Sequence, residues 1–145
     1  MNPGDSGSGF AERHAELRRV LGGLRDPQER LAWVVERSRN RIGIPLEDRT
    51  DARLVPGCAA RLWLVAELLE DRCRFACESD SAILKAAAGL LCDLYSGLTP
   101  EEVRTCEPTV FTESGLMSQF TENRRRTVQR VREAIREFAV RHQAG

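Results

Sequence analysis

The segment from residue 81 to residue 95 constrains the fold of this chain more than any other part of its sequence. Its residues are apolar almost all round a helical projection. A helix that is hydrophobic on every side has to be covered by other elements, so we expect this one to be central and buried. Ser79 or Asp80 is the expected N-cap of the helix, and Gly97 its expected end.

The residues before this helix alternate as two β-strands. With Glu70-Asp71 as the turn of a hairpin over residues 61–78, Glu67 faces Arg74 in an opposite-charge cross-strand pair. The same register gives the hairpin one apolar face, made of Leu62, Leu64, Ala66, Leu68, Cys73, Phe75 and Cys77. Glu-Asp is not a favoured two-residue turn, so the register depends on this face and on the cross-strand pair. We expect a third strand beside the hairpin.

Helical periodicity and capping signals place the other elements on either side of the hairpin. Asp26 is the expected N-cap of the second helix, and Thr99 opens a capping box with Glu102. Residues 42–57 have no regular period and are expected to form an ordered surface connection. We expect helices at about residues 11–21, 27–40, 81–95 and 100–105, and a long one from residue 121. This order predicts an α+β fold, in which several helices pack against a small antiparallel sheet.

Length and composition indicate one domain. The chain has 145 residues, of which 41% are hydrophobic, and this is enough for a single buried core. We assign residues 10–145 to this domain. Residues 1–9 are rich in Gly and Ser and are assigned to a flexible tail.

The charges of the chain give no overall attraction to nucleic acid or to a membrane, because twenty-two basic residues balance twenty-two acidic ones. The arginine cluster at residues 124–126 has no aromatic side chains beside it for base stacking. No apolar run approaches the ~20 residues of a membrane span. The five cysteines occur in a chain without a signal-peptide pattern, which indicates a reducing cytoplasm.

Cys58 differs from the other cysteines because Pro56-Gly57 precedes it. Proline fixes φ and glycine accepts backbone angles closed to other residues, so this pair can project the next side chain from a sharp corner. The thiolate is the nucleophile, and a positive charge from Arg61 or from an arginine of another element would lower its pKa. Spacing alone leaves a reactive thiol and an inert turn cysteine as equal alternatives.

The remaining cysteines favour core packing. Cys73 and Cys77 lie on the apolar face of the hairpin and Cys92 lies in the apolar helix, whereas Cys106 follows a helix end and is ambiguous. The cysteine spacings include one C-x3-C and no C-x2-C, so a zinc or iron–sulfur site is a weak alternative. Motifs of hydrolases and phosphate-binding loops are absent, and His14 is expected to be a packed or surface histidine.

Several segments, taken in order, resemble the SufE family of sulfur-acceptor proteins. The resemblance runs from about Asp26 to Ala139, and its core is a cysteine turn, a tryptophan-bearing strand and an S-D-x-A-I-x-K helix start. The segments are Arg49-Thr50-Asp51, Leu54-Val55-Pro56-Gly57-Cys58, Leu62-Trp63-Leu64-Val65, Ser79-Asp80-Ser81-Ala82-Ile83-Leu84-Lys85, Tyr95-Ser96-Gly97, Thr99-Pro100-Glu101-Glu102 and Gly115-Leu116.

The resemblance implies a partner of a SufS-like cysteine desulfurase. Cys58 would take a persulfide sulfur from the desulfurase, stimulate it, and deliver the sulfur to an iron–sulfur scaffold. The protein would be an accessory protein and not an enzyme by itself; it would have no cofactor of its own, since the pyridoxal phosphate belongs to the desulfurase. The resemblance also implies a fold similar to that of iron–sulfur scaffold proteins, with the cysteine on a loop over the sheet. Asp80 and Arg124 match the polar residues that the family uses around the cysteine loop and partner surface.

The chain also departs from the family pattern. Ala59-Ala60-Arg61 follow the cysteine in place of the usual Gln-Ser-Gln. Glu122-Asn123 replace the usual Pro-Ser before Arg124, a later glycine is missing, and Arg125 or Arg126 could take the role of Arg124. The main alternative is a metal- or partner-binding scaffold of the same fold without sulfur transfer. A thiol redox enzyme is disfavoured, because no second cysteine lies close in sequence to Cys58.

Overall fold

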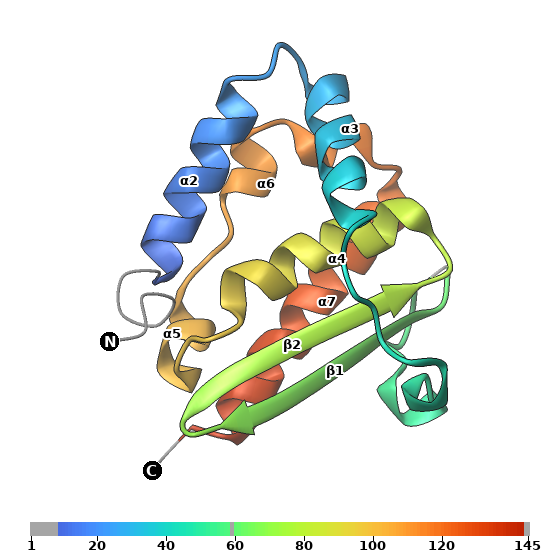
Figure 1. Ribbon diagram of the computed structural model, residues 1–145, viewed down its shortest axis with the longest axis vertical. Helices are drawn as coiled ribbons and strands as arrows, with labels where there is room; N and C mark the ends of the chain where they lie inside the picture. The colour runs from blue at the N-terminus through green and yellow to red at the C-terminus, as the bar shows by residue number, and fades with distance from the viewer. Residues whose placement is uncertain (1–8, 59, 144–145) are drawn as a thin grey trace.

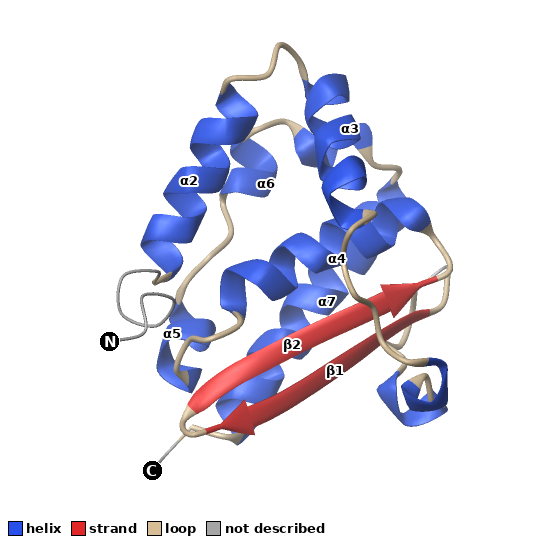
Figure 2. Cartoon of the chain, viewed as in Figure 1, coloured by secondary structure: helices blue, strands red, loops and turns tan. Residues whose placement is uncertain are grey.

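A computed structural model of the chain describes residues 9–58 and 60–143. The tail expected at residues 1–9 therefore lies, apart from Gly9, outside the described residues. The described part consists of helices packed against one antiparallel hairpin, which confirms the α+β class (Figure 2). The main elements are α2 (Phe10–Gly22), α3 (Pro27–Ser38), β1 (Leu62–Leu69), β2 (Arg72–Ser79), α4 (Ala82–Tyr95), α5 (Pro100–Thr105), α6 (Val110–Glu113) and α7 (Glu122–Arg141).

Helix α4 is the centre of the fold, as its sequence requires. It packs against β2 and also contacts α2, α3 and α7, and it runs through the middle of the molecule between the sheet and the N-terminal helices (Figure 1). Ten of its fourteen residues are buried, and Leu91 and Tyr95 are fully enclosed. The apolar periphery of this helix thus determines which elements surround it.

The N-cap of α4 is Ser81, so the expectation of Ser79 or Asp80 was wrong by one or two residues. The Ser81 hydroxyl accepts a hydrogen bond from Leu84 N at 3.2 Å. Ser79 is used otherwise: its hydroxyl donates to the main-chain oxygen of Arg61 at 2.7 Å and accepts from Ser81 N at 3.1 Å. The residue that was expected to cap the helix instead fastens the segment before β1 to the segment before α4.

The hairpin has the register that the sequence predicts. Glu67 lies opposite Arg74 and Leu69 opposite Arg72, and the predicted apolar face packs on the core. Both turn residues adopt positive φ, 49° at Glu70 and 67° at Asp71. A two-residue turn of this kind matches the twist of the strands, but it holds a glutamate in a region that L-residues avoid.

The turn gives a first testable prediction. Replacing Glu70 by Asn and Asp71 by Gly should stabilise the protein by about 1 kcal/mol, because these residues accept positive φ at lower cost. Urea denaturation of the double variant measures the gain. Asp71→Ala is the control and should destabilise the protein, since alanine has neither the freedom of glycine nor the local hydrogen bonds of aspartate. Equal stability of all three proteins would show that the positive φ angles of Glu70 and Asp71 cost no stability.

The expected third strand is not present in the part of the chain that the structure describes. A single bridge joins Leu54 to Trp63, and the connection before it folds into two short 3₁₀ turns, Leu46–Asp48 and Asp51–Arg53. These turns use backbone groups locally, as in the bond from Asp48 N to Pro45 O at 2.9 Å. Backbone groups bonded within a turn cannot pair along a strand, which explains the two-stranded sheet.

The other helices follow their sequence signals. The Asp26 side chain caps α3 by accepting from Glu29 N at 3.0 Å, and Thr99 and Glu102 form the capping box of α5. His14 is buried in α2, where its Nε2 accepts from Val110 N at 2.9 Å, so it is a packed histidine. The segment at 107–120 contains α6 and a 3₁₀ turn, Leu116–Gln119. The inward stripe of α7 consists of Thr127, Val128, Val131, Ile135, Phe138 and Ala139.

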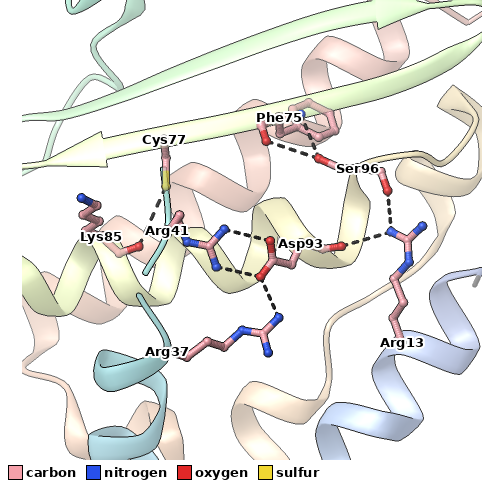
Figure 3. Close-up of polar contacts among 8 residues, drawn as sticks. All are labelled: Arg13, Arg37, Arg41, Phe75, Cys77, Lys85, Asp93 and Ser96. Carbon is pink, nitrogen blue, oxygen red and sulfur yellow. Dashed lines mark hydrogen bonds and ion pairs between the residues drawn. The ribbon is translucent and has the colours of Figure 1, made fainter. Parts of the chain in front are cut away.

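A polar network ties the N-terminal helices to the end of α4 (Figure 3). Arg41 donates from both terminal nitrogens to the Asp93 carboxylate, at 2.8 and 2.7 Å, and Arg37 of α3 adds a bond at 3.0 Å. Arg13 of α2 donates to the main-chain oxygen of Asp93 at 3.1 Å and to that of Ser96. The network therefore joins α2, α3 and the segment after α3 to the C-terminal end of α4.

Candidate functional site

The cysteine loop, residues 56–61, is closed at its base. Val55 N donates to the main-chain oxygen of Leu62 at 2.9 Å, and the bridge from Leu54 to Trp63 lies just outside this bond. Gly57 has φ of +79°, so the turn predicted from Pro56 and Gly57 uses the freedom of glycine. Ala59 lies outside the described residues.

The Cys58 side chain is covered by the core on one side and exposed to solvent on the other. The side chain is half-buried and packs against the core cluster, and it hydrogen-bonds with Thr127 of α7. Burial raises the pKa of the thiol above its ordinary value, and the Thr127 bond and the positive charge of Arg130 only partly oppose this rise. Burial in the closed loop therefore favours the neutral form of the Cys58 thiol.

Arg130 lies directly against the turn. A Cβ atom built on Gly57 would lie 2.7 Å from Cζ of Arg130 and 2.8 Å from its Nε, closer than a side chain can approach. The guanidinium thus occupies the space that a side chain at position 57 would need. The positive φ is what requires glycine at position 57, because the exposed end of the Arg130 side chain could move aside for a methyl group.

Gly57→Ala should lower the free energy of unfolding by about 1 kcal/mol, because alanine is strained at positive φ. Chemical denaturation of the variant measures this loss. The matched background is Arg130→Ala, which removes the guanidinium from the added methyl group. Most of the cost should persist there, since the backbone strain is independent of Arg130. Complete loss of the cost in that background would show that the contact, and not φ, requires glycine.

Arg61 and Asp80 meet at the other end of the loop. Arg61 Nε donates to the Asp80 carboxylate at 2.8 Å, and Asp80 N donates to the main-chain oxygen of Arg61 at 3.1 Å. The Arg61 guanidinium also lies 5.2 Å from the ring centroid of Trp63. Of the two sources of charge considered for Cys58, it is an arginine of another element, Arg130, that acts on the thiol, while Arg61 is paired with Asp80.

Arg124 lies in the first turn of α7, where its main-chain N donates to the capping hydroxyl of Thr121 at 3.3 Å. Its neighbour Arg125 donates to the main-chain oxygen of Phe120 at 2.7 Å and so holds the turn before the helix. Arg130, six residues beyond Arg124, is the α7 arginine at the loop.

Sequence reasoning did not single out Thr127 or Arg130 for the site. Thr127 could have been found, because it lies four residues before Val131 on the inward stripe of α7 and a buried hydroxyl needs a partner. Arg130 has no such signal, since only the packing of the loop on α7 brings it to Gly57.

The other thiols are placed as the sequence predicts. Cys73, Cys77 and Cys92 are buried, and burial raises the pKa of Cys73 to about 11. Cys77 of β2 donates a weak hydrogen bond to the main-chain oxygen of Lys85 in α4, at 3.9 Å (Figure 3). Cys106 is half-buried, and its pKa is raised by burial. Within residues 9–58 and 60–143, no three His, Cys, Asp or Glu side chains are grouped closely enough to hold a metal ion.

Membrane insertion through a helix has no support in the described residues: none of their helices has the length and apolar character needed to cross a bilayer.

Comparison with known proteins places the chain in a family. Residues 15–139 match SufE, described as an "Fe-S metabolism associated domain". The chain is 36% identical over 81 residues to the chloroplastic quinolinate synthase of Arabidopsis thaliana, a stretch that covers 55% of this chain and 11% of that protein. It is 25% identical over 99 residues to an uncharacterised SufE-like protein of Synechocystis, covering 68% of this chain and 62% of that one.

A further relative is an uncharacterised SufE-like protein of Rhizobium meliloti, 26% identical over 102 residues, which covers 67% of this chain and 73% of that one. The chain thus spans less than two thirds of the Arabidopsis and Synechocystis proteins. The solution structure of a hypothetical protein from Thermus thermophilus has the same fold, with a TM-score of 0.73 at 19% identity, covering 89% of this chain and 94% of that one. With the match extending from residue 15 to residue 139, the chain belongs to the SufE family of Fe–S metabolism associated domains.

Proposed function

We propose that this protein accepts persulfide sulfur from a cysteine desulfurase on Cys58, stimulates that enzyme, and delivers the sulfur for iron–sulfur cluster assembly. Membership of the SufE family supports a role in Fe–S metabolism. The observation that carries the choice of residue is the position of Cys58 on a short loop, with Thr127 and Arg130 of α7 against it. The compartment would be a reducing one such as the cytoplasm, in keeping with the free thiol of Cys58.

The proposed chemistry is a sulfur exchange. The Cys58 thiolate attacks the terminal sulfur of a cysteine persulfide on the desulfurase, and a bond forms between Cys58 Sγ and that sulfur. The sulfur–sulfur bond of the donor breaks, and the donor cysteine leaves as a thiolate with the electron pair. One sulfur atom moves from one cysteine to the other, so the step needs no oxidant, reductant or resident cofactor of this protein.

We expect the loop to open for this exchange, because Cys58 is half-buried when it is closed. Both ends of the loop are fastened, by the bond from Val55 N to Leu62 O and by those from Ser79 and Asp80 to Arg61 O. Movement would therefore be confined to the residues between, which carry the thiol. Opening also removes the burial that raises the pKa of Cys58, so the thiol becomes a better nucleophile as it reaches the partner.

The test uses the full chain, a cysteine desulfurase and cysteine. Intact mass should show one added sulfur atom, and peptide mapping should place it on Cys58. Cysteine turnover by the desulfurase should increase in the presence of the protein. If no sulfur is added with any of several desulfurases, the protein is not a carrier, and metal analysis of anaerobically purified protein then tests a scaffold of the same fold.

A further inference from the structure

The Cys58 site has a second half on α7, made of Thr127 and Arg130. Thr127 is 1% exposed and hydrogen-bonds with Cys58 from the core side. Arg130 lies on the exposed side, with its guanidinium over the backbone of Gly57. The two side chains are three residues apart, so nearly one turn of a single rigid helix presents both to the loop.

We propose that Thr127 and Arg130 form an anion-holding pair that offsets part of the cost of negative charge on the sulfur of Cys58 in the closed loop, on the minor thiolate form before loading and on the persulfide after it. This inference rests on the proposed function and assigns two residues to it. Thr127 touches the reacting sulfur, whereas Arg130 is a positioning residue that acts through its field and through its contact with Gly57.

The hydroxyl of Thr127 can serve both charge states of the sulfur. In the closed loop it donates to the main-chain oxygen of Asn123 at 3.0 Å, so its lone pairs are available to a thiol proton. When Cys58 ionises, rotation of the hydroxyl turns the same proton toward the sulfur. The Asn123 oxygen keeps the bond of the α7 backbone, so this rotation leaves no buried group unsatisfied.

The charges around the loop make Arg130 the effective cation. Arg61, the charged residue of the loop itself, is paired with the Asp80 carboxylate that faces it from the β2–α4 turn. The field of Arg130 lowers the pKa of Cys58. Its guanidinium also lies against Gly57, the residue directly before Cys58.

The experiment measures alkylation of Cys58 by iodoacetamide as a function of pH, with the Cys58 peptide quantified by mass spectrometry. At a pH below the thiol pKa, Arg130→Gln should slow the reaction about threefold, since less thiolate is present. Arg130→Lys keeps the charge and should restore most of the rate. Arg136→Gln, the same change at a residue of α7 paired with Glu133, should have no effect.

Thr127→Val keeps the shape of the side chain and removes its hydroxyl. It should slow alkylation about fivefold, as expected for one lost hydrogen bond to the sulfur, and Thr127→Ser should recover most of the rate. Thermal melting checks that each variant is folded.

Some outcomes would overturn the inference. If the pH profile of Arg130→Gln matches that of the unaltered protein, or if Gln and Lys shift it equally, Arg130 does not act by its charge. An unchanged profile in Thr127→Val removes the hydroxyl from the pair. These alkylation measurements need no desulfurase. Failure of the unaltered protein to load sulfur would contradict the proposed function, and the alkylation profiles would still test this inference.

Discussion

Cys58→Ser should reduce sulfur loading by more than about 100-fold, to the background of the assay, because a serine hydroxyl is not ionised at neutral pH and is a far weaker nucleophile than a thiolate. Intact mass after incubation with a cysteine desulfurase and cysteine measures the loss. Stimulation of cysteine turnover should disappear with it, since an acceptor that cannot take sulfur cannot relieve the enzyme of its persulfide.

The matched control is Cys106→Ser, which removes another half-buried thiol. Its loading should equal that of the unaltered protein. Equal loading of the Cys58 and Cys106 variants would mean that the sulfur goes elsewhere. Both substitutions leave the three fully buried cysteines in place, so a change in folding should not explain the difference; circular dichroism checks this.

Asp93→Ala should lower the free energy of unfolding by about 2 kcal/mol, since it leaves the mostly buried donors of Arg41 without their acceptor. The Arg41 side chain is 17% exposed and makes two bonds to Asp93, and Arg37 makes a third (Figure 3). The expected loss of about 2 kcal/mol comes mainly from the unpaired Arg41 donors. The Asp93 side chain itself contributes less, because it is 36% exposed and partly screened by solvent. Urea denaturation at neutral pH measures the loss.

The stability that the Asp93 carboxylate contributes should depend on pH. Burial alone would raise the pKa of Asp93, but the hydrogen bonds and charges of Arg41 and Arg37 outweigh it and hold the pKa below its usual value. A carboxyl group with a lowered pKa in the folded state adds stability above its unfolded pKa of about 3.9, and this stability is lost as the pH falls toward the folded pKa. The difference between the unaltered protein and Asp93→Ala should therefore shrink below about pH 4.

An exposed ion pair on the same side of the molecule is the control. Glu36 and Arg39 form a pair on α3 and just beyond it, with side chains 73% and 70% exposed. Glu36→Ala should change stability by less than about 0.5 kcal/mol. If Asp93→Ala costs no more than Glu36→Ala, the network at the end of α4 is not a stabilising one.

The elements of this fold are encoded locally, and sequence patterns therefore predict them. Phe10, His14, Leu17 and Leu21 are spaced to lie on one helical face, and they form the buried face of α2. Capping residues mark the starts of α3 and α5. The hairpin register followed from alternation, because a shift by one residue would turn its apolar face outward. The predicted third strand does not form in the described residues, because the connection before β1 pairs its backbone groups within 3₁₀ turns. No periodicity of the sequence indicates such turns.

The segment at residues 81–95 shows how far a sequence alone can reach. Its apolar surface determined that a helix would lie at the centre, covered on all sides, since exposing it would cost too much hydrophobic free energy. The cysteine turn was likewise visible from Pro56 and Gly57.

The environment of Cys58 was decided only by the tertiary structure. Closure of the loop on α7 buries the thiol, brings Thr127 and Arg130 to it, and pairs Arg61 with Asp80 instead. The pKa of a thiol depends on burial, hydrogen bonds and the distances to charges, and each of these joins residues far apart in the chain. Local sequence specifies the helix and the turn; only their packing against each other specifies the chemistry between them.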